Sequence, residues 1–96
     1  MKVRLVVTME AEPGRGADLA AVMAERAKEV MQEPGCEQFE MFRSVTEPDK
    51  LALLELWADQ AALDVHAKVN ATRPPLPAGL RKAGGSREDY GYNRVR

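Results

Sequence analysis

Residues 36–70, CEQFEMFRSVTEPDKLALLELWADQAALDVHAKVN, contain two strand patterns followed at once by a helix pattern. The segments 36–45 and 50–57 are rich in aromatic, β-branched and leucine residues, as strands are. The connector between them is short and carries Pro48, so we expect an antiparallel hairpin. Asp59 comes next and can accept hydrogen bonds from the first free amides of a helix, which we expect over about 60–70.

The flanking sequence supplies the remaining elements. Residues 2–9 alternate in the manner of a strand, and apolar residues recur at three- and four-residue steps after Asp18, which we expect to cap an amphipathic helix. The segment 71–87 is rich in proline and glycine and predicts a loop with one short helical turn around 78–82, and 88–95 predicts a weaker terminal strand. The order β-α-β-β-α-β predicts a single domain over 1–96 of the α+β class, a ferredoxin-like sandwich with an antiparallel sheet.

Composition excludes several kinds of partner. Lys and Arg total 14 against 15 for Asp and Glu, and they form no basic stripe, so we expect no nucleic acid. The longest apolar run already contains Glu55 and the N-terminal residues lack a signal-peptide pattern, so we expect no membrane and a cytoplasmic protein. The chain has one Cys and one His, a poor set of metal ligands, so we expect no metal.

Hydrophobic residues project from both faces of the predicted sheet. In the strand 50–57, Leu51, Leu53 and Trp57 point to one side, and Ala52, Leu54 and Leu56 point to the other. Two helices cover one side of a sheet only, and a sheet with one face in water would show cleaner alternation. We therefore predict an obligate homodimer that packs sheet against sheet.

The motifs EPGCEQFEMFRSV at 33–45 and LLELWADQAALDVH at 53–66 resemble the antibiotic biosynthesis monooxygenase superfamily. The resemblance covers residues 34–66 well, the N-terminal strand and helix loosely, and the last 25 residues poorly. It implies a dimeric α+β barrel with a pocket between sheet and helices. It also implies a cofactor-independent monooxygenase that oxidises a small phenolic or quinol-like aromatic with O₂. Such chemistry needs a base, a dry aromatic-lined cavity and donors for a developing oxyanion, and no prosthetic group.

The resemblance also indicates which residues form the site. His66 matches the family's helix histidine and is the candidate catalytic base, because histidine exchanges a proton near neutrality; the alternative is a core-edge histidine satisfied by a carbonyl or carboxylate. Trp57 is expected to form a pocket wall and to donate a hydrogen bond to a substrate oxygen, or else to be an ordinary core aromatic. Phe39 and Phe42 lie on opposite faces of their strand, so one is expected in the cavity and the other in the dimer core.

Arg43 and Asn70 complete the substrate-binding candidates. If Val45 lies opposite Leu51, Arg43 and Glu55 are diagonal neighbours and form a structural pair. With the register changed by one residue, Glu55 instead opposes Glu40, and the two carboxylates raise one pKa and offer an acid. Asn70 follows His66 by one helical turn and either orients a substrate or ends the helix.

Besides a degenerate family member with a structural role only, two other functions are alternatives. The first is a non-catalytic dimeric module that binds a small aromatic metabolite. The second is haem binding or degradation. Haem-degrading relatives of the fold use a helix histidine as iron ligand together with a tryptophan, and His66 and Trp57 are the corresponding residue types in this chain. Those relatives also use an Asn near the end of the first strand, where this chain has Val7, Thr8 and Met9.

Overall fold

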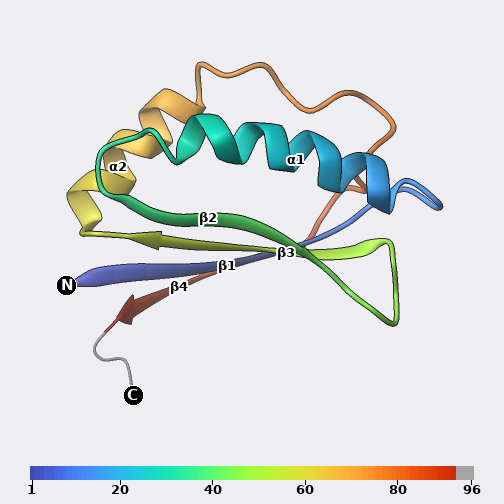
Figure 1. Cartoon of the computed structure of the whole chain (residues 1–96), viewed down its shortest axis with the longest axis horizontal. Helices are drawn as coiled ribbons and strands as arrows, with labels where there is room; N and C mark the ends of the chain where they lie inside the picture. The colour runs from blue at the N-terminus through green and yellow to red at the C-terminus, as the bar shows by residue number, and fades with distance from the viewer. Residues whose placement is uncertain (93–96) are drawn as a thin grey trace.

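Four antiparallel strands form one sheet in the order β2-β3-β1-β4, and both helices cover the same face of it (Figure 1). The computed structural model describes residues 1–92. The elements are β1 (Lys2–Glu10), α1 (Gly16–Val30), β2 (Cys36–Arg43), β3 (Lys50–Trp57), α2 (Gln60–Asn70) and β4 (Ser86–Tyr92). This arrangement confirms the predicted α+β, ferredoxin-like fold.

The core lies between the sheet and the two helices. Strand β3 alternates strictly, with Leu51, Leu53, Glu55 and Trp57 buried and the alternate residues Ala52, Leu54 and Leu56 partly exposed. The helices contribute buried residues at helical spacing, among them Leu19 and Met23 of α1 and Leu63 of α2. The period of two in the strands and of 3.6 in the helices therefore sets which side of each element faces the core.

The two helices are capped in different ways. Asp59 caps α2 as predicted, because its side chain accepts a hydrogen bond from the Ala62 amide at 2.8 Å. The prediction for Asp18 was wrong: α1 begins at Gly16, and Asp18 instead pairs with Arg15. The first amides near α1 are satisfied by Asp49 of the β2–β3 hairpin, whose carboxylate accepts from Gly14 at 2.9 Å and from Gly16 at 3.0 Å.

The register of the β2–β3 hairpin differs from both predicted alternatives. Phe39 lies opposite Glu55, and Arg43 lies opposite Leu51. Strand β2 ends at Arg43 because the Ser44 hydroxyl accepts hydrogen bonds from the amides of Thr46 and Glu47, which starts the turn early. The predicted pairs of Glu55 with Arg43 and with Glu40 are therefore both wrong.

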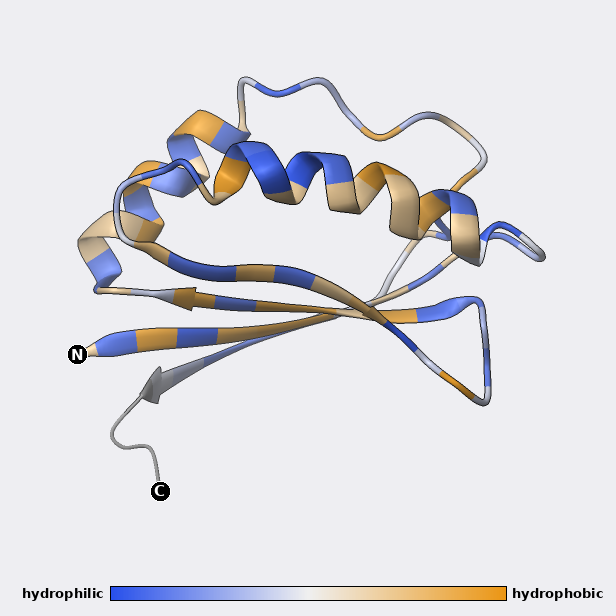
Figure 2. Cartoon of the chain, in the orientation of Figure 1, coloured by the Kyte–Doolittle hydropathy of each residue, from blue (hydrophilic) through white to orange (hydrophobic). Residues whose placement is uncertain are grey.

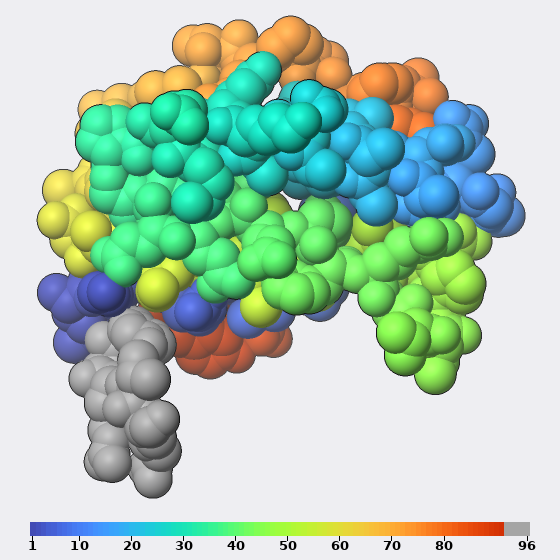
Figure 3. Space-filling view, in the orientation of Figure 1, coloured from blue at the N-terminus to red at the C-terminus, as the bar shows by residue number. Residues whose placement is uncertain are grey.

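The segment between α2 and β4 crosses the helical layer as a long loop (Figure 1). The predicted helical turn at 78–82 is absent; Leu80 is buried after a turn, and Arg81 forms an isolated bridge with Ala11. The terminal strand starts two residues earlier than predicted, at Ser86, and residues 93–95 of that prediction lie outside the described part. The tip of the β2–β3 hairpin projects from the body at the end of the sheet that lies away from α2 (Figure 3).

The outer face of the sheet carries apolar side chains that no described helix covers. Strand β3 is hydrophobic over most of its length (Figure 2), and its outward residues Leu54 and Leu56 are only partly buried. Phe42 and Tyr90, on the same face, are 44% and 50% exposed. Among residues 1–92, no helix is long and apolar enough to span a membrane.

Candidate functional site

A cleft of about 610 Å³ opens between the sheet and the helices. This size is within the usual range for sites that bind small molecules. Its apolar lining includes Val7, Met9, Met23, Phe39, Leu53 and Leu76. Its polar lining includes Arg26, Glu55, His66, Asn70, Arg81 and Arg87. The cleft therefore combines an apolar floor with several titratable or charged groups.

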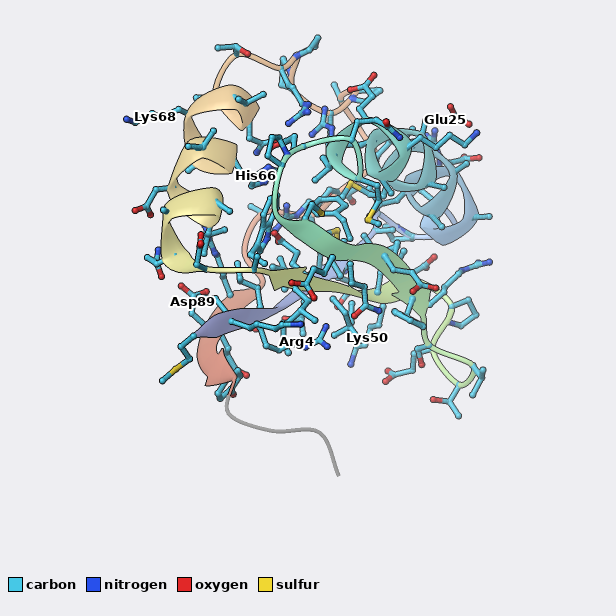
Figure 4. All side chains as sticks on the ribbon, turned by 60° about the vertical axis from the view of Figure 1, so that its left-hand side comes forward. Arg4, Glu25, Lys50, His66, Lys68 and Asp89 are labelled. Carbon is cyan, nitrogen blue, oxygen red and sulfur yellow. The ribbon has the colours of Figure 1, made fainter. Side chains whose placement is uncertain are left out.

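His66 is held on several sides within this cleft. It is 7% exposed and points from α2 into the space between the helices and the sheet, whereas Lys68 on the same helix points away (Figure 4). Its ring centroid lies 4.6 Å from that of Trp57 and 5.9 Å from that of Phe39. Its Nδ1 lies 2.9 Å from Glu33 Oε1. These contacts fix the orientation of the imidazole.

Glu33 lies in the turn after α1 and joins His66 to Arg73. Its second carboxylate oxygen accepts a hydrogen bond from Arg73 Nη2 at 2.7 Å, and both side chains are largely buried. A carboxylate accepts hydrogen bonds only, so the His66 proton resides on Nδ1. In the neutral ring Nε2 is then an acceptor, which is the state that a general base requires.

Glu55 places a buried carboxyl group in the same cleft. It is 5% exposed and accepts a hydrogen bond from Trp57 Nε1 at 3.0 Å. Burial raises the pKa of Glu55 above its ordinary value, while the Trp57 hydrogen bond and the charges of His66 and Arg87 oppose this rise. Glu55 is thus suited to hold a proton at a pH where an exposed carboxyl group has lost it.

The predicted site residues are only partly brought together. His66, Phe39 and Asn70 line the cleft. Trp57 is fully buried, is absent from the cleft lining and donates its N–H to Glu55, so its predicted bond to a substrate oxygen stays a prediction. The indole ring contacts the His66 ring at an interplanar angle of 33°, and its N–H orients the Glu55 carboxyl group.

Phe42 and Arg43 lie away from this cleft. The observed register turns Phe42 toward the outer face of the sheet, and Arg43 donates a hydrogen bond to the Pro48 carbonyl in the hairpin. Both line a separate hollow of about 630 Å³ beside the hairpin. Phe39 and Phe42 therefore lie on opposite faces of β2, as predicted, with Phe39 in the cleft and Phe42 on the outer face, whereas Arg43 is absent from the cleft lining.

The sequence did not predict three residues at or beside the cleft: Glu33, Glu55 and Arg81. The charge of Glu55 within an apolar row was a signal, although it was interpreted through pairing with Arg43 or Glu40. Glu33 is in a turn and Arg81 is in a proline- and glycine-rich loop, where no periodic pattern shows the direction of a side chain. Their positions near the cleft depend on packing between distant segments.

The described residues offer little for metal or thiol chemistry. Among residues 1–92, no group of three or more His, Cys, Asp or Glu side chains is arranged to hold a metal ion. Burial raises the pKa of the Cys36 thiol to about 11, so the thiol is protonated near neutrality and is a weak nucleophile. The groups suited to chemistry are therefore His66 and Glu55.

The chain is thus a small α+β domain with a ferredoxin-like sheet, and a histidine and a buried carboxyl group share one cleft on the helical side of that sheet. The family model for antibiotic biosynthesis monooxygenase matches residues 2–72, and the chain belongs to this family. No curated protein matches the chain significantly.

Solved structures reproduce the fold over nearly the full chain. Protein PA3566 from Pseudomonas aeruginosa matches with a TM-score of 0.79 and 20% identity, covering 97% of this chain and 95% of its own. A Deinococcus radiodurans protein with a provisional assignment as an antibiotic biosynthesis monooxygenase matches with a TM-score of 0.76 and 17% identity, covering 100% and 96%. A Bacteroides thetaiotaomicron protein described as a possible oxidoreductase matches with a TM-score of 0.76 and 19% identity, and the match covers 95% of this chain and 97% of that protein. At these identities the likeness establishes the fold alone.

Proposed function

We propose that this chain is a cofactor-independent monooxygenase that oxidises a small phenolic or quinol-like aromatic with O₂. The observation that carries the proposal is the cleft in which Glu33 holds His66 with its proton on Nδ1, beside the buried carboxyl group of Glu55. Membership of the antibiotic biosynthesis monooxygenase family supports the reaction class.

His66 acts first in the proposed reaction. Its Nε2 takes the proton of a phenolic hydroxyl, and the resulting phenolate passes one electron to O₂. The aryloxyl radical and superoxide then combine at a ring carbon to form a peroxide. Glu55, whose pKa is raised by burial, donates a proton to this peroxide as its O–O bond breaks, and it recovers the proton that the ring carbon loses. The hydroxide that leaves takes the phenolic proton back from His66 and becomes water. Overall the ring gains one oxygen atom and two hydrogen atoms leave as water, which forms a quinone from a phenol.

Oxygen consumption tests this proposal directly. Wild type is supplied with a panel of hydroquinones in an oxygen-electrode cell, and His66→Ala is expected to lower turnover by roughly 10²- to 10⁴-fold. Lys68→Ala is the matched control, because Lys68 is on the same helix but points away from the cleft (Figure 4). Binding of hydroquinones by both wild type and His66→Ala, without oxygen consumption by either, would instead identify a non-catalytic binding module.

We further propose that the active form is a homodimer joined through the outer faces of the two sheets. Leu54 and Leu56 lie near the centre of this face, and Phe42 and Tyr90 are exposed on it. A second copy would remove this apolar surface from water, which stabilises association by roughly 25 cal/mol per Å² before the costs of association are subtracted.

Sedimentation tests the dimer. Wild type is expected to sediment as a dimer at micromolar concentration, and Leu54→Arg is expected to give monomers. Val65→Arg is the matched control, because Val65 is an exposed residue of α2 on the helical side. A monomeric wild type, or equal dimerisation of both variants, contradicts this interface.

A further inference from the structure

Positive charge in the cleft exceeds negative charge. Three of its lining residues are arginines, Arg26 from α1, Arg81 from the loop before β4 and Arg87 from β4. The only carboxyl group among the described lining residues is that of Glu55. Arg87 is already engaged, because its Nε lies 3.5 Å from Asp89 and its charge acts on Glu55. The excess positive charge of the cleft lining therefore comes from Arg26 and Arg81.

Neither Arg26 nor Arg81 forms an ion pair within residues 1–92. Each is held instead by a backbone carbonyl: Arg26 Nη2 donates to Pro74 at 2.7 Å, and Arg81 Nη2 donates to Gly84 at 3.2 Å. A carbonyl uses one N–H of the five on a guanidinium and adds no full negative charge. The two groups are thus positioned without a counterion. Arg73, in contrast, is paired with both Glu33 and Glu29.

The remaining lining residues of the cleft favour a ligand with an aromatic ring. Val7, Leu53, Phe39 and Leu76 give the cleft an apolar surface, and His66 and Glu55 supply groups that exchange protons with hydroxyls. Guanidinium groups bind carboxylates and phosphates through paired, charge-assisted hydrogen bonds. A ligand that uses the whole lining therefore combines an aromatic ring with an anionic substituent.

We propose that the substrate of this cleft is an aromatic anion, a hydroxylated ring whose carboxylate or phosphate is bound by Arg26 and Arg81. The hydroxylated ring rests on the proposed function, whereas the anion rests on the two arginines alone. The loop 71–85 takes part in specificity, because it supplies Arg81 and also the carbonyl that holds Arg26.

Calorimetric titration of matched ligands tests the proposal. 2,5-Dihydroxybenzoate and hydroquinone have the same ring and hydroxyls and differ by one carboxylate; phenyl phosphate against phenol provides the phosphate arm. Wild type is expected to bind the preferred anion at least about tenfold more tightly than its neutral counterpart. Whichever anion shows the larger gain identifies the substituent.

Variants assign this preference to the two arginines. Arg26→Gln and Arg81→Gln are each expected to reduce the preference several-fold, and the double variant is expected to abolish it. Lys68→Gln removes the same charge from an exposed position outside the cleft lining and is expected to keep the preference. Arg26→Gln removes the hydrogen bond to Pro74 and could impair folding. Arg81 is exposed, so Arg81→Gln is expected to fold and tests the proposal by itself.

Three results would overturn the proposal: equal binding of the charged and neutral ligands, a preference that survives in the double variant, or an equal loss in Lys68→Gln. Failure of the proposed oxygenase activity would look different. It would show as tight, arginine-dependent binding of 2,5-dihydroxybenzoate with no oxygen consumed, whereas turnover of hydroquinone without any anion preference would contradict the anion site only.

Discussion

Glu33→Gln tests the buried network that orients His66. The Glu33 carboxylate contacts His66 Nδ1 at 2.9 Å and Arg73 Nη2 at 2.7 Å, and the three side chains are only 9 to 13% exposed. Glutamine has nearly the same shape but no charge and a single acceptor oxygen, so it cannot accept hydrogen bonds from both His66 Nδ1 and Arg73. Arg73 then keeps only the exposed Glu29, at 3.5 Å, as an ionic partner.

The size of the loss follows from these contacts. A hydrogen bond to a charged group contributes about 1.5 to 3 kcal/mol, and a buried charge left without its partner costs about 3 to 5 kcal/mol. Arg73 keeps one partner, so we expect Glu33→Gln to lower the free energy of unfolding by about 2 kcal/mol. For a domain of this size, that corresponds to a fall in Tm of roughly 8 to 16 °C.

Urea denaturation and thermal melting at one fixed protein concentration measure this change. The matched control is Glu29→Gln, because Glu29 contacts the same arginine but is 69% exposed, and a surface pair contributes at most about 1 kcal/mol. If Glu33→Gln and Glu29→Gln differ by less than about 0.5 kcal/mol, the buried network does not stabilise the fold as argued. In that event Glu33 also loses its role in fixing the His66 proton on Nδ1.

Two further predictions concern carboxyl groups with shifted pKa values. The raised pKa of Glu55 means that the folded state holds its proton more tightly than the unfolded chain, so this stabilisation is present below the ordinary value of 4.5 and is lost as pH rises through the folded pKa. Urea titrations from pH 4 to 8 should therefore show Glu55→Gln gaining stability relative to wild type as pH rises, and parallel curves would contradict the burial argument. Asp49→Ala should lower the Tm at pH 7 by more than Asp18→Ala does, because only the Asp49 side chain accepts hydrogen bonds from the amides at the start of α1. Hydrogen bonds from Gly14 and Gly16 lower the pKa of Asp49, so its contribution should fade as pH falls through that pKa; an equal cost for the two alanine variants would refute the cap.

The sequence by itself determined the elements and their order. Strand β3 and helix α2 have the predicted bounds, because strict alternation over 50–57 and the Asp59 cap are local signals that depend only on neighbouring residues. Helical spacing also places His66 on the same face as Leu63 and Ala67, which indicates that it points toward the sheet. Apolar periodicity is sufficient for these features, since each face of an element is set within a few residues.

Only the tertiary structure decided the contents of the cleft. The two registers open to the sequence put different phenylalanines on the inner face, and the observed register, with Phe39 opposite Glu55, places Phe39 and not Phe42 beside His66. Glu33 reaches His66 across 33 positions of sequence, and Asp49 caps a helix that begins 33 positions earlier. Such contacts join segments whose local patterns carry no information about one another. They form because packing both helices on one face of the sheet brings the ends of distant segments together.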